Sequence, residues 1–345
     1  MKEALIDRTI SVTIHDTPIP TPEANQVLIR VVVSGSNPKD WKLPKLAASD
    51  EPPKNQGDDI AGYVESVGPE VTAFKKGDKV AAFHQINTPH GSYAEYAIAW
   101  EHTTFHVPER TSFEEAATLP LASMTAALGM YQWLELPLPW NPALKQIPLV
   151  VYGGATAVGA FAIKFAMLSN IHPIIAVAGK GIPFVETLLD KSKGDIVLDY
   201  REGDTVLRQK IKQAAGGQQI LYAYDAVSEK GSYENIFAVL DKGGIFTHVL
   251  PISAHKPDGI EGRFTYVSSV HVAHKGHQLG DPDFGAALFH FMGRGLAKGW
   301  FKGHPYEVRK GGLNGVEGLL KDLEAGKASA VKYVVRIGDT PGLKG

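Results

Sequence analysis

Apolar residues in the first third of the chain fall into short runs that are typical of β-strands. The clearest run covers residues 27–33 and is apolar and mostly β-branched. Further strands are predicted over residues 60–67, 79–83 and 93–98. Glycines separate these runs as turns or bulges, at Gly57, Gly62, Gly68, Gly77 and Gly91. Many short strands with glycine turns predict a partly open, barrel-like β unit.

The hydrophobic period changes near residue 112. A helix is predicted over residues 113–131, broken or kinked at Pro120, and a proline-rich surface loop over 136–142. Strands are then predicted over 148–152, 173–178, 196–200, 220–225 and 244–250, with helices over 158–165 and 182–189 between them. This alternation is typical of a parallel, doubly wound α/β sheet.

The last part of the chain has a less regular pattern. Residues 252–285 show no clear period. Helices are predicted over 284–296 and 316–324, and a closing strand over 332–337.

Length, net charge and the absence of cysteine exclude several classes of function. The 345 residues suggest two domains. A net charge of −2 argues against a nucleic-acid binder, and the absence of cysteine excludes disulfides, thiolate nucleophiles and thiolate-bound zinc. The first residues lack the apolar segment of a secretory signal, and no apolar run reaches the ~18 residues of a membrane span. We therefore expect a cytoplasmic protein that binds neither nucleic acid nor membrane.

The strongest local motif is the glycine-rich segment of residues 152–159, Tyr-Gly-Gly-Ala-Thr-Ala-Val-Gly. It follows an apolar strand and precedes an amphipathic helix, so small residues would let a pyrophosphate approach the helix N-terminus. Its spacing differs from the usual G-x-G-x-x-G, because Ala155 and Ala157 stand where glycine is common. A tight strand-to-helix turn without a ligand is the alternative.

The end of the next strand indicates which dinucleotide is bound. An NAD site usually has an acidic residue there, whereas this strand ends in Ala178-Gly179-Lys180-Gly181. Lys180 is a candidate partner for a 2′-phosphate, which favours NADPH. The alternative is that Lys180 is a solvated loop lysine. Tyr200 and Arg201 end the following strand and are candidates for the adenosine end.

Three further segments resemble a known family. Residues 57–68, with Val71 and residues 77–80, resemble the signature of medium-chain dehydrogenase/reductases. Residues 37–42 (Asn-Pro-Lys-Asp-Trp-Lys) and 91–96 resemble its quinone-reductase and enoyl-reductase branches. In detail the chain is most similar to fungal ToxD-like, trans-acting enoyl reductases that partner polyketide synthases.

This resemblance implies an α/β architecture of two domains. A GroES-like β-barrel would cover residues 1–115 and be completed by about 290–345, and a Rossmann domain would cover 116–289. NADPH would lie between them. The implied cofactor residues are Lys39, Asp40, Trp41, Lys42, Ala155, Thr156, Ala157, Val158, Lys180, Gly181, Tyr200, Val249, Leu250, Val334 and Val335. The implied substrate wall is Ser123, Met124, Thr125 and Met130.

The chain departs from the family pattern at two places. Zinc-dependent relatives have cysteine and a Gly-His-Glu at the metal, whereas here Asp58 and Asp59 follow Gly57, so we expect no catalytic zinc. Some enoyl reductases carry a tyrosine acid after Asn-Pro, but residues 43–56 contain no tyrosine. The proton donor is therefore left open.

Other polar residues suggest alternative sites. Four histidines, His255, His271, His274 and His277, are candidates for a metal site, but a polar loop is favoured because no carboxylate lies at ligand spacing. Asp225 and Ser232 are not accompanied by a nucleophile elbow, which sets hydrolase chemistry aside.

We therefore expect an oxidoreductase that transfers hydride from NADPH to the activated C=C bond of an enone or enoyl thioester. Lys42 and Thr125 are the candidates for stabilising the developing enolate; alternatively, Lys42 contacts only cofactor phosphate or ribose. An NADPH:quinone oxidoreductase and a non-catalytic NADPH-binding sensor or scaffold are the rival hypotheses. A polyketide synthase acting in trans is a candidate partner, and either a monomer or a homodimer fits.

Overall fold

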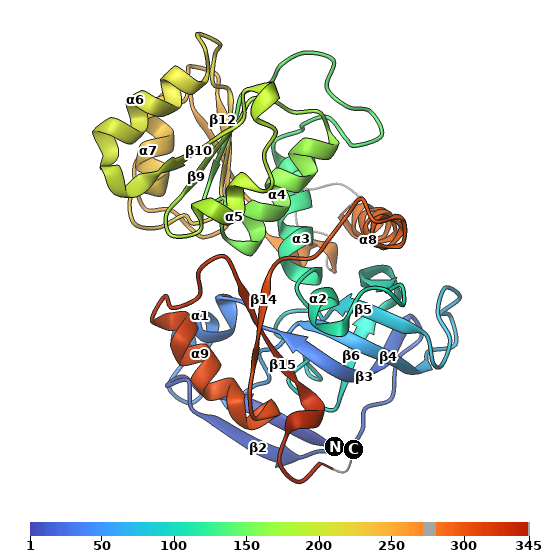
Figure 1. Ribbon diagram of the computed structural model, residues 1–345. Coiled ribbons are helices and arrows are strands. Elements are labelled where there is room, and N and C mark those ends of the chain that lie inside the picture. Colours follow the sequence, from blue (N-terminus) through green and yellow to red (C-terminus); the bar gives the residue numbers. More distant parts are fainter. Residues whose placement is uncertain (272–280, 344–345) are drawn as a thin grey trace. The chain divides into compact units, whose positions relative to one another are not determined.

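The computed structural model describes residues 1–271 and 281–343 (Figure 1). The chain divides into two compact units, Met1–Met124 with Ser268–Gly345, and Thr125–Val267. These boundaries differ from the predicted ones, which fell after residue 115 and near residue 290. One reason is helix α8 (Asp281–Lys298), which packs on the first unit, where Phe289 stacks on Phe105 of β7 (Thr104–His106) at 5.4 Å.

The first unit is built on a seven-stranded sheet in its described residues. Its order is β14-β15-β3-β4-β5-β7, and β6 also pairs with β3. The bounds are β3 Gln26–Gly35, β4 Asp59–Val67, β5 Lys79–Phe83, β6 Tyr96–Trp100, β14 Tyr306–Arg309 and β15 Lys332–Arg336, with a separate hairpin of β1 Lys2–Ile6 and β2 Val12–Asp16. Antiparallel pairing of β15 with β3 places the end of the chain beside residues 33–35.

The strands predicted over 27–33, 60–67, 79–83 and 332–337 are confirmed, and the one predicted over 93–98 begins later, as β6; their apolar faces are buried together. Val27, Ile29 and Val31 alternate into one core on β3. Leu319 and Leu320 of the amphipathic helix α9 (Val316–Glu324) pack into the same core. Helix α1 (Lys39–Leu46) contacts α9, and Trp41 in its first turn packs against the same core.

The second unit contains a parallel sheet of six described strands, in the order β10-β9-β8-β11-β12-β13 (Figure 1). The strands are β8 Leu149–Tyr152, β9 Ile174–Ala178, β10 Ile196–Asp199, β11 Tyr222–Asp225, β12 Ile245–His248 and β13 Glu261–Phe264. The order reverses between β8 and β11, where ligands of such sheets bind at the carboxyl ends of the strands. The predicted doubly wound sheet is therefore confirmed.

Helices cover both faces of this sheet. Helices α6 (Asp204–Ala214) and α7 (Ser232–Val239) pack on the face that carries Val150 and Val177, while α4 (Ala157–Leu168) and α5 (Ile182–Glu186) lie on the other (Figure 1). The sequence pattern missed β13, which falls within the segment without clear period. Its residues, Glu-Gly-Arg-Phe, are polar because β13 is an edge strand.

The helix predicted over residues 113–131 forms three pieces. Helix α2 (Phe113–Ala116) ends before Pro120, which begins α3 (Pro120–Ala127), and a π-helix follows at Leu128–Trp133. Proline lacks an N–H group and is tolerated in the first helical turn, so the predicted break at Pro120 is confirmed. The boundary between the two units falls inside α3.

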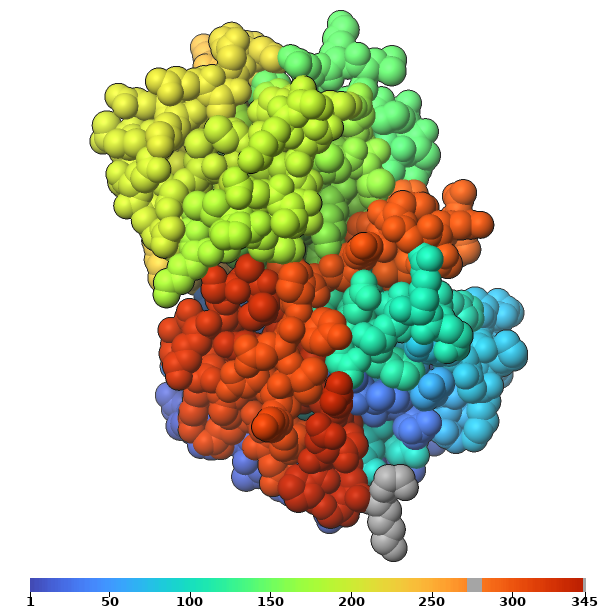
Figure 2. All heavy atoms as spheres, viewed as in Figure 1, coloured from blue at the N-terminus to red at the C-terminus, as the bar shows by residue number. Residues whose placement is uncertain are grey.

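The proline-rich segment after this helix lies on the surface of the second unit, as predicted. Figure 2 shows the region in green. Trp140 is 56% exposed and Leu144 is 97% exposed. Among the helices of the described residues, none has the length and apolar character needed to cross a membrane.

Candidate functional site

The turn between β8 and α4 forms a glycine cradle. Gly153 has φ +84°, which favours glycine, and a Cβ atom there would lie 2.5 Å from Val227. A Cβ atom on Gly159 would lie 2.2 Å from the carbonyl oxygen of Gly153, so the helix and the turn can approach this closely only because residue 159 is glycine. The unusual spacing of the motif thus still gives the close backbone approach of a dinucleotide-binding turn.

The residues between these glycines open the N-terminus of α4. Thr156 caps the helix, because its hydroxyl accepts a hydrogen bond from the Gly159 N–H (3.0 Å) and donates one to the Gly153 carbonyl (2.9 Å). Ala155, Ala157 and Val158 are half-buried and Thr156 is exposed. Backbone N–H groups at such a helix end attract a phosphate, so these residues fit a pyrophosphate.

The ends of β9 and β10 present Lys180 and Tyr200 side by side in the second unit. The two strands pair in parallel with Asp199 opposite Ala178. The Tyr200 ring packs on Gly179, where a Cβ atom would lie 2.7 Å from the ring, and the ring is 48% exposed. Lys180 is exposed, forms no hydrogen bond or ion pair with described residues, and precedes the buried Gly181. An aromatic face beside an ammonium group fits an adenosine that carries a phosphate.

Arg201, a candidate for the adenosine end, pairs with an acidic residue of its own strand end. Its guanidinium forms hydrogen bonds of 2.6 to 3.0 Å to both carboxylate oxygens of Asp199. These hydrogen bonds lower the pKa of Asp199 to about 2. Arg201 is therefore engaged by a neighbour on the same strand end, whereas Lys180 is available.

The ends of β11 and β12 complete the carboxyl edge of this sheet. Val249 and Leu250 follow β12 and are half-buried; the Val249 N–H donates to the Ser228 hydroxyl (3.0 Å). Asp225 is buried at the end of β11 and accepts a hydrogen bond from the Ser232 hydroxyl (2.7 Å). Burial raises the pKa of Asp225 to about 6. The structure thus pairs Asp225 with Ser232, a contact that was not predicted from the sequence.

In the first unit, the first turn of α1 holds the other group of implied cofactor residues. The Lys39 ammonium lies 3.0 Å from Asp40 Oδ1, forms an ion pair with Asp58, and donates to the Gln56 carbonyl (2.6 Å). Asp40 Oδ2 accepts hydrogen bonds from the Asn37 N–H (2.9 Å) and the Tyr93 hydroxyl (2.8 Å). Lys39 and Asp40 are therefore parts of a buried polar network.

The two residues after Asp40 are more accessible. Trp41 and Lys42 are both half-buried, and the Trp41 ring packs against the core of the first unit. The Lys42 ammonium lies 5.4 Å from the centre of the Trp41 ring, a cation–π distance. This contact holds the Lys42 head group at the helix surface.

A second ion pair continues the buried network. Lys332, the first residue of β15, pairs with Asp59 and donates to the Asn37 side chain (3.0 Å). Asp59 also accepts hydrogen bonds from Asn37 Nδ2 (2.7 Å) and from the Leu121 N–H (2.7 Å). We name Lys39, Asp40, Asp58, Asp59 and Lys332 the charged cluster. Adjacent aspartates before an apolar strand were the signal in the sequence, but their lysine partners were not predicted.

Protonation in the charged cluster is shifted by burial. Desolvation raises the pKa of both Asp40 and Asp58 to about 6, although the Lys39 ammonium opposes this shift. Burial alone would lower the pKa of Lys39, but the charges of Asp40 and Asp58 raise it above its ordinary value. Lys39 therefore stays charged, while the two carboxylates titrate near neutral pH.

The implied substrate residues lie on α3 and on the π-helix that follows it. Ser123, Met124 and Met130 are fully buried and Thr125 is 5% exposed. The Ser123 hydroxyl forms no hydrogen bond with described residues. The Tyr224 hydroxyl donates to the Thr125 carbonyl (2.8 Å), which fixes this part of the helix to the second unit.

Val334 and Val335 lie within β15 between β14 and β3. Both side chains are fully buried, and Val335 belongs to the core of the first unit. The structure therefore gives their side chains a packing role, and only their backbone could meet a ligand.

The histidines do not form a metal centre in the described part of the chain. His255 is exposed, and His271 contacts the Phe83 carbonyl through Nε2 (3.1 Å). Burial lowers the pKa of His271 to about 3, which keeps the ring neutral. His274 and His277 lie outside the described residues. Within residues 1–271 and 281–343, no three histidine or acidic side chains are placed to hold a metal ion.

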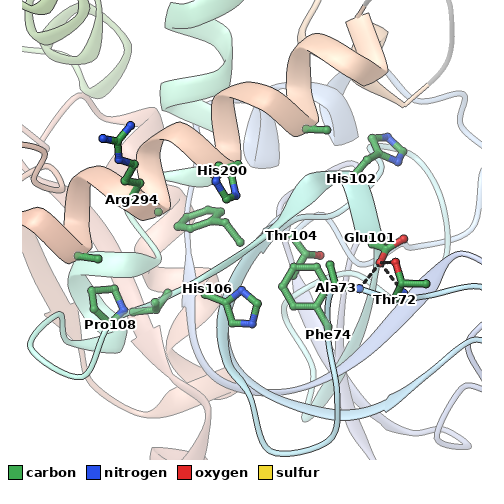
Figure 3. Close-up of a pocket in the computed structure, with 15 residues that line it drawn as sticks. Thr72, Ala73, Phe74, Glu101, His102, Thr104, His106, Pro108, His290 and Arg294 are labelled. Atoms are coloured by element: carbon green, nitrogen blue, oxygen red, sulfur yellow. Dashed lines mark hydrogen bonds between the residues drawn. The ribbon is translucent and has the colours of Figure 1, made fainter.

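A cavity of about 840 Å³ lies elsewhere in the first unit (Figure 3). Phe74, His102, His106, His290 and Arg294 are among its lining residues, which come from η1 (Glu101–Thr103), β7, α8 and the segment 72–74. None of the cofactor or substrate residues expected from the sequence lines it. This cavity is therefore separate from the residues that form the candidate site.

Comparison with known proteins identifies the family. Residues 23–109 match the family described as the alcohol dehydrogenase GroES-like domain. The trans-enoyl reductase fsr4 of Gibberella fujikuroi is 45% identical over 320 residues, which cover 91% of this chain and 92% of that protein. This chain belongs to the trans-enoyl reductase family of the medium-chain dehydrogenase/reductases. The resemblance inferred from residues 37–42, 57–68 and 91–96 is thus confirmed.

Solved structures of medium-chain dehydrogenase/reductases share the fold over the whole chain. The CurK enoyl reductase has a TM-score of 0.78 at 19% identity, covering 97% of this chain and 98% of that one. Mycobacterial Rv1454c in complex with NADPH has a TM-score of 0.76 at 20% identity, covering 97% and 99%. At these identities the likeness concerns the architecture, a GroES-like domain with a Rossmann-type sheet, as predicted.

Proposed function

We propose that this protein reduces the activated C=C bond of an enone or enoyl thioester with NADPH. The observation that carries the proposal is membership of the trans-enoyl reductase family over nearly the full chain, together with an intact glycine cradle at β8 and α4. The trans-enoyl reductases among its relatives supply the reaction class. The residues of this chain supply the cofactor preference and the candidate groups for catalysis.

The preference for NADPH rests on the ends of β9 and β10. No carboxylate follows β9 to accept a hydrogen bond from a ribose 2′-hydroxyl, and Lys180 is exposed beside the Tyr200 ring. Asp199 is the nearest acid along the edge, but Arg201 occupies both of its oxygens. A 2′-phosphate would therefore meet a positive side chain and no competing negative one.

When bound, the reduced nicotinamide supplies hydride to the β-carbon of the alkene. Negative charge then develops on the substrate carbonyl oxygen, which a preorganised donor stabilises. Lys42, held at the surface of α1 by the Trp41 ring, and the Thr125 hydroxyl are the proposed donors. Their task is to orient the carbonyl, since the family reaction depends on the geometry between nicotinamide and alkene.

Delivery of the substrate as a thioester by a polyketide synthase in trans is part of the proposal. It rests on the family alone. A quinone acceptor is the rival, because quinone reductases share the fold. Comparing turnover of an enoyl thioester, a simple enone and a quinone with saturating NADPH separates these possibilities. Binding of NADPH without turnover of any acceptor would instead support a scaffold or sensor.

The roles of Lys42 and Thr125 are tested by single-turnover hydride transfer at saturating NADPH. Removing one such donor lowers the rate by ~10²–10³ when it acts mainly in the transition state. We expect a moderate decrease for Lys42→Ala and a smaller one for Thr125→Val. Unchanged rates in both variants would remove these residues from catalysis, and weaker NADPH binding with an unchanged rate would place Lys42 on the cofactor.

A further inference from the structure

The charged cluster is one positive charge short of neutrality. It contains the lysines Lys39 and Lys332 and the aspartates Asp40, Asp58 and Asp59. Four of these residues are at most 4% exposed, and the Lys39 side chain is 17% exposed. An unbalanced buried charge is costly, so the cluster has a strong tendency to bind one further proton.

The hydrogen bonds show where that proton belongs. Asp59 is satisfied by Lys332, the Asn37 side chain and the Leu121 N–H. The remaining negative charge is therefore shared by Asp40 and Asp58, which flank the Lys39 ammonium. Burial raises the pKa of both carboxyls to about 6. The titratable or charged groups around Lys39 are Asp40, Asp58, Asp59, Tyr93, His84 and Lys332.

We propose that Asp40, Lys39 and Asp58 are the acid of the active site: this trio takes up one proton when the anionic cofactor binds, and Lys39 passes a proton to the α-carbon of the substrate. This inference rests on the proposed function. Lys39 is the member that can deliver the proton because it is the only one of the three with appreciable exposure.

The proton transfer balances the reduction. The β-carbon gains hydride from the cofactor, which is oxidised, and the π-electron pair of the alkene becomes an enolate. The α-carbon of the enolate then forms a bond to a proton of the Lys39 ammonium, and the N–H electron pair stays on Nζ. Nζ regains a proton from the carboxylic acid shared by Asp58 and Asp40. This route supplies the proton that no tyrosine in residues 43–56 can give.

Cofactor binding is expected to promote protonation of the trio of Asp40, Lys39 and Asp58. The dinucleotide carries several negative charges, and Lys39 to Lys42 are the residues implied to contact it. A negative charge brought near a carboxyl raises its affinity for a proton. The trio should therefore be largely deprotonated in the free protein at pH 7 and take up a proton on binding.

Calorimetry of NADPH binding in two buffers of different ionisation enthalpy measures this uptake without turnover. At pH 7 the wild type should take up nearly one proton more than Asp58→Asn, because that variant balances the buried charge. At pH 5 the difference should shrink, since the wild type already holds the proton. Lys45→Gln is the matched control: Lys45 lies on the same helix as Lys39, its ion pair with Glu324 of α9 is at the surface, and the variant should behave as wild type. Equal uptake in all three proteins would overturn the proposal.

The configuration of a product tests delivery by Lys39. An α-methyl enoyl thioester gives a new stereocentre at the α-carbon, which a protein-bound acid protonates from one face. We expect one configuration from the wild type and a mixture approaching 1:1 from Lys39→Gln/Asp58→Asn, with NADPH still consumed. The same single configuration from both proteins would overturn the proposal. If the wild type does not consume NADPH with any alkene, the proposed function fails instead, and the calorimetry still decides whether the trio binds a proton.

Discussion

The two units hold their implied cofactor residues in opposite ways. In the second unit, Lys180 and Tyr200 are exposed side chains at the ends of two strands, next to a backbone cradle of glycines. In the first unit, Asp40 is buried and Lys39 is half-buried, and Lys39 forms ion pairs with Asp40 and with Asp58, the residue before β4. The implied cofactor side chains of the second unit can thus be replaced without loss of buried contacts, whereas Lys39 and Asp40 of the first unit also contribute to its stability.

Because of this difference, substitutions in the two units should affect cofactor affinity and protein stability differently. Replacing an exposed side chain at the strand ends should change cofactor affinity and leave the free energy of unfolding nearly unchanged. Replacing a member of the charged cluster should change stability and protonation together, because it leaves a buried charge without its partner.

Lys332→Met should have the largest effect. It leaves Asp59 buried without its ammonium partner, which typically costs about 3–5 kcal/mol in the free energy of unfolding. Chemical denaturation measures the loss. Lys321→Met, which breaks the exposed pair with Glu317 on α9, should cost less than about 1 kcal/mol. Similar losses in both variants would show that the buried ion pair contributes no more to stability than the exposed one.

Asp58→Asn should change how stability depends on pH. The folded-state pKa of about 6 lies above the ordinary value of 3.8, so the folded protein retains a proton that the unfolded chain releases. The free energy of unfolding of the wild type should therefore decrease as the pH rises from 4 to 6. This decrease should exceed that of the variant by on the order of 2 kcal/mol. Asp199→Asn is the control: the pKa of Asp199 is lowered to about 2, so its contribution to stability is lost only as the pH falls below about 4, and this variant should follow the wild type between pH 4 and pH 6. Parallel curves for wild type and Asp58→Asn would contradict the assignment.

Gly159→Ala should damage the cradle of the second unit. The new methyl group would lie 2.2 Å from the Gly153 carbonyl oxygen, and overpacking of this kind costs about 1–3 kcal/mol. NADPH affinity should fall with it, as measured by fluorescence titration. Gly318→Ala, in α9 with no neighbour within 4 Å, is the matched control and should stabilise the protein by up to about 1 kcal/mol. An unchanged free energy of unfolding and NADPH affinity in Gly159→Ala would mean that the turn accommodates the methyl group.

Lys180→Ala should affect binding alone. Loss of a charged contact to a 2′-phosphate costs about 1–3 kcal/mol, so the NADPH dissociation constant should rise ~10-fold or more while that for NADH stays nearly constant. The melting temperature of the free protein should not move, because Lys180 is exposed. Equal weakening of both cofactors, or an initial preference for NADH, would contradict the NADPH assignment.

Features that depend on neighbouring residues along the chain could be predicted from the sequence, whereas features that depend on tertiary contacts could not. Apolar periodicity predicted β3 to β5 and the parallel sheet, and residues 152–159 predicted the cradle, because these features depend on neighbours along the chain. The pairing of Asp59 with Lys332 joins residues far apart in sequence, and only the β3–β15 pairing brings them together. The polar edge strand β13 and the packing of α8 on the first unit likewise depend on tertiary contacts.

Enoyl reduction by this protein is tested most directly with NADPH that carries deuterium at the transferable position of the nicotinamide. Incubation with an α,β-unsaturated thioester should consume one NADPH per product, and mass spectrometry should find one deuterium on the β-carbon. NADPH binding without reduction of the thioester, or turnover with a quinone alone, would contradict the proposed enoyl reduction.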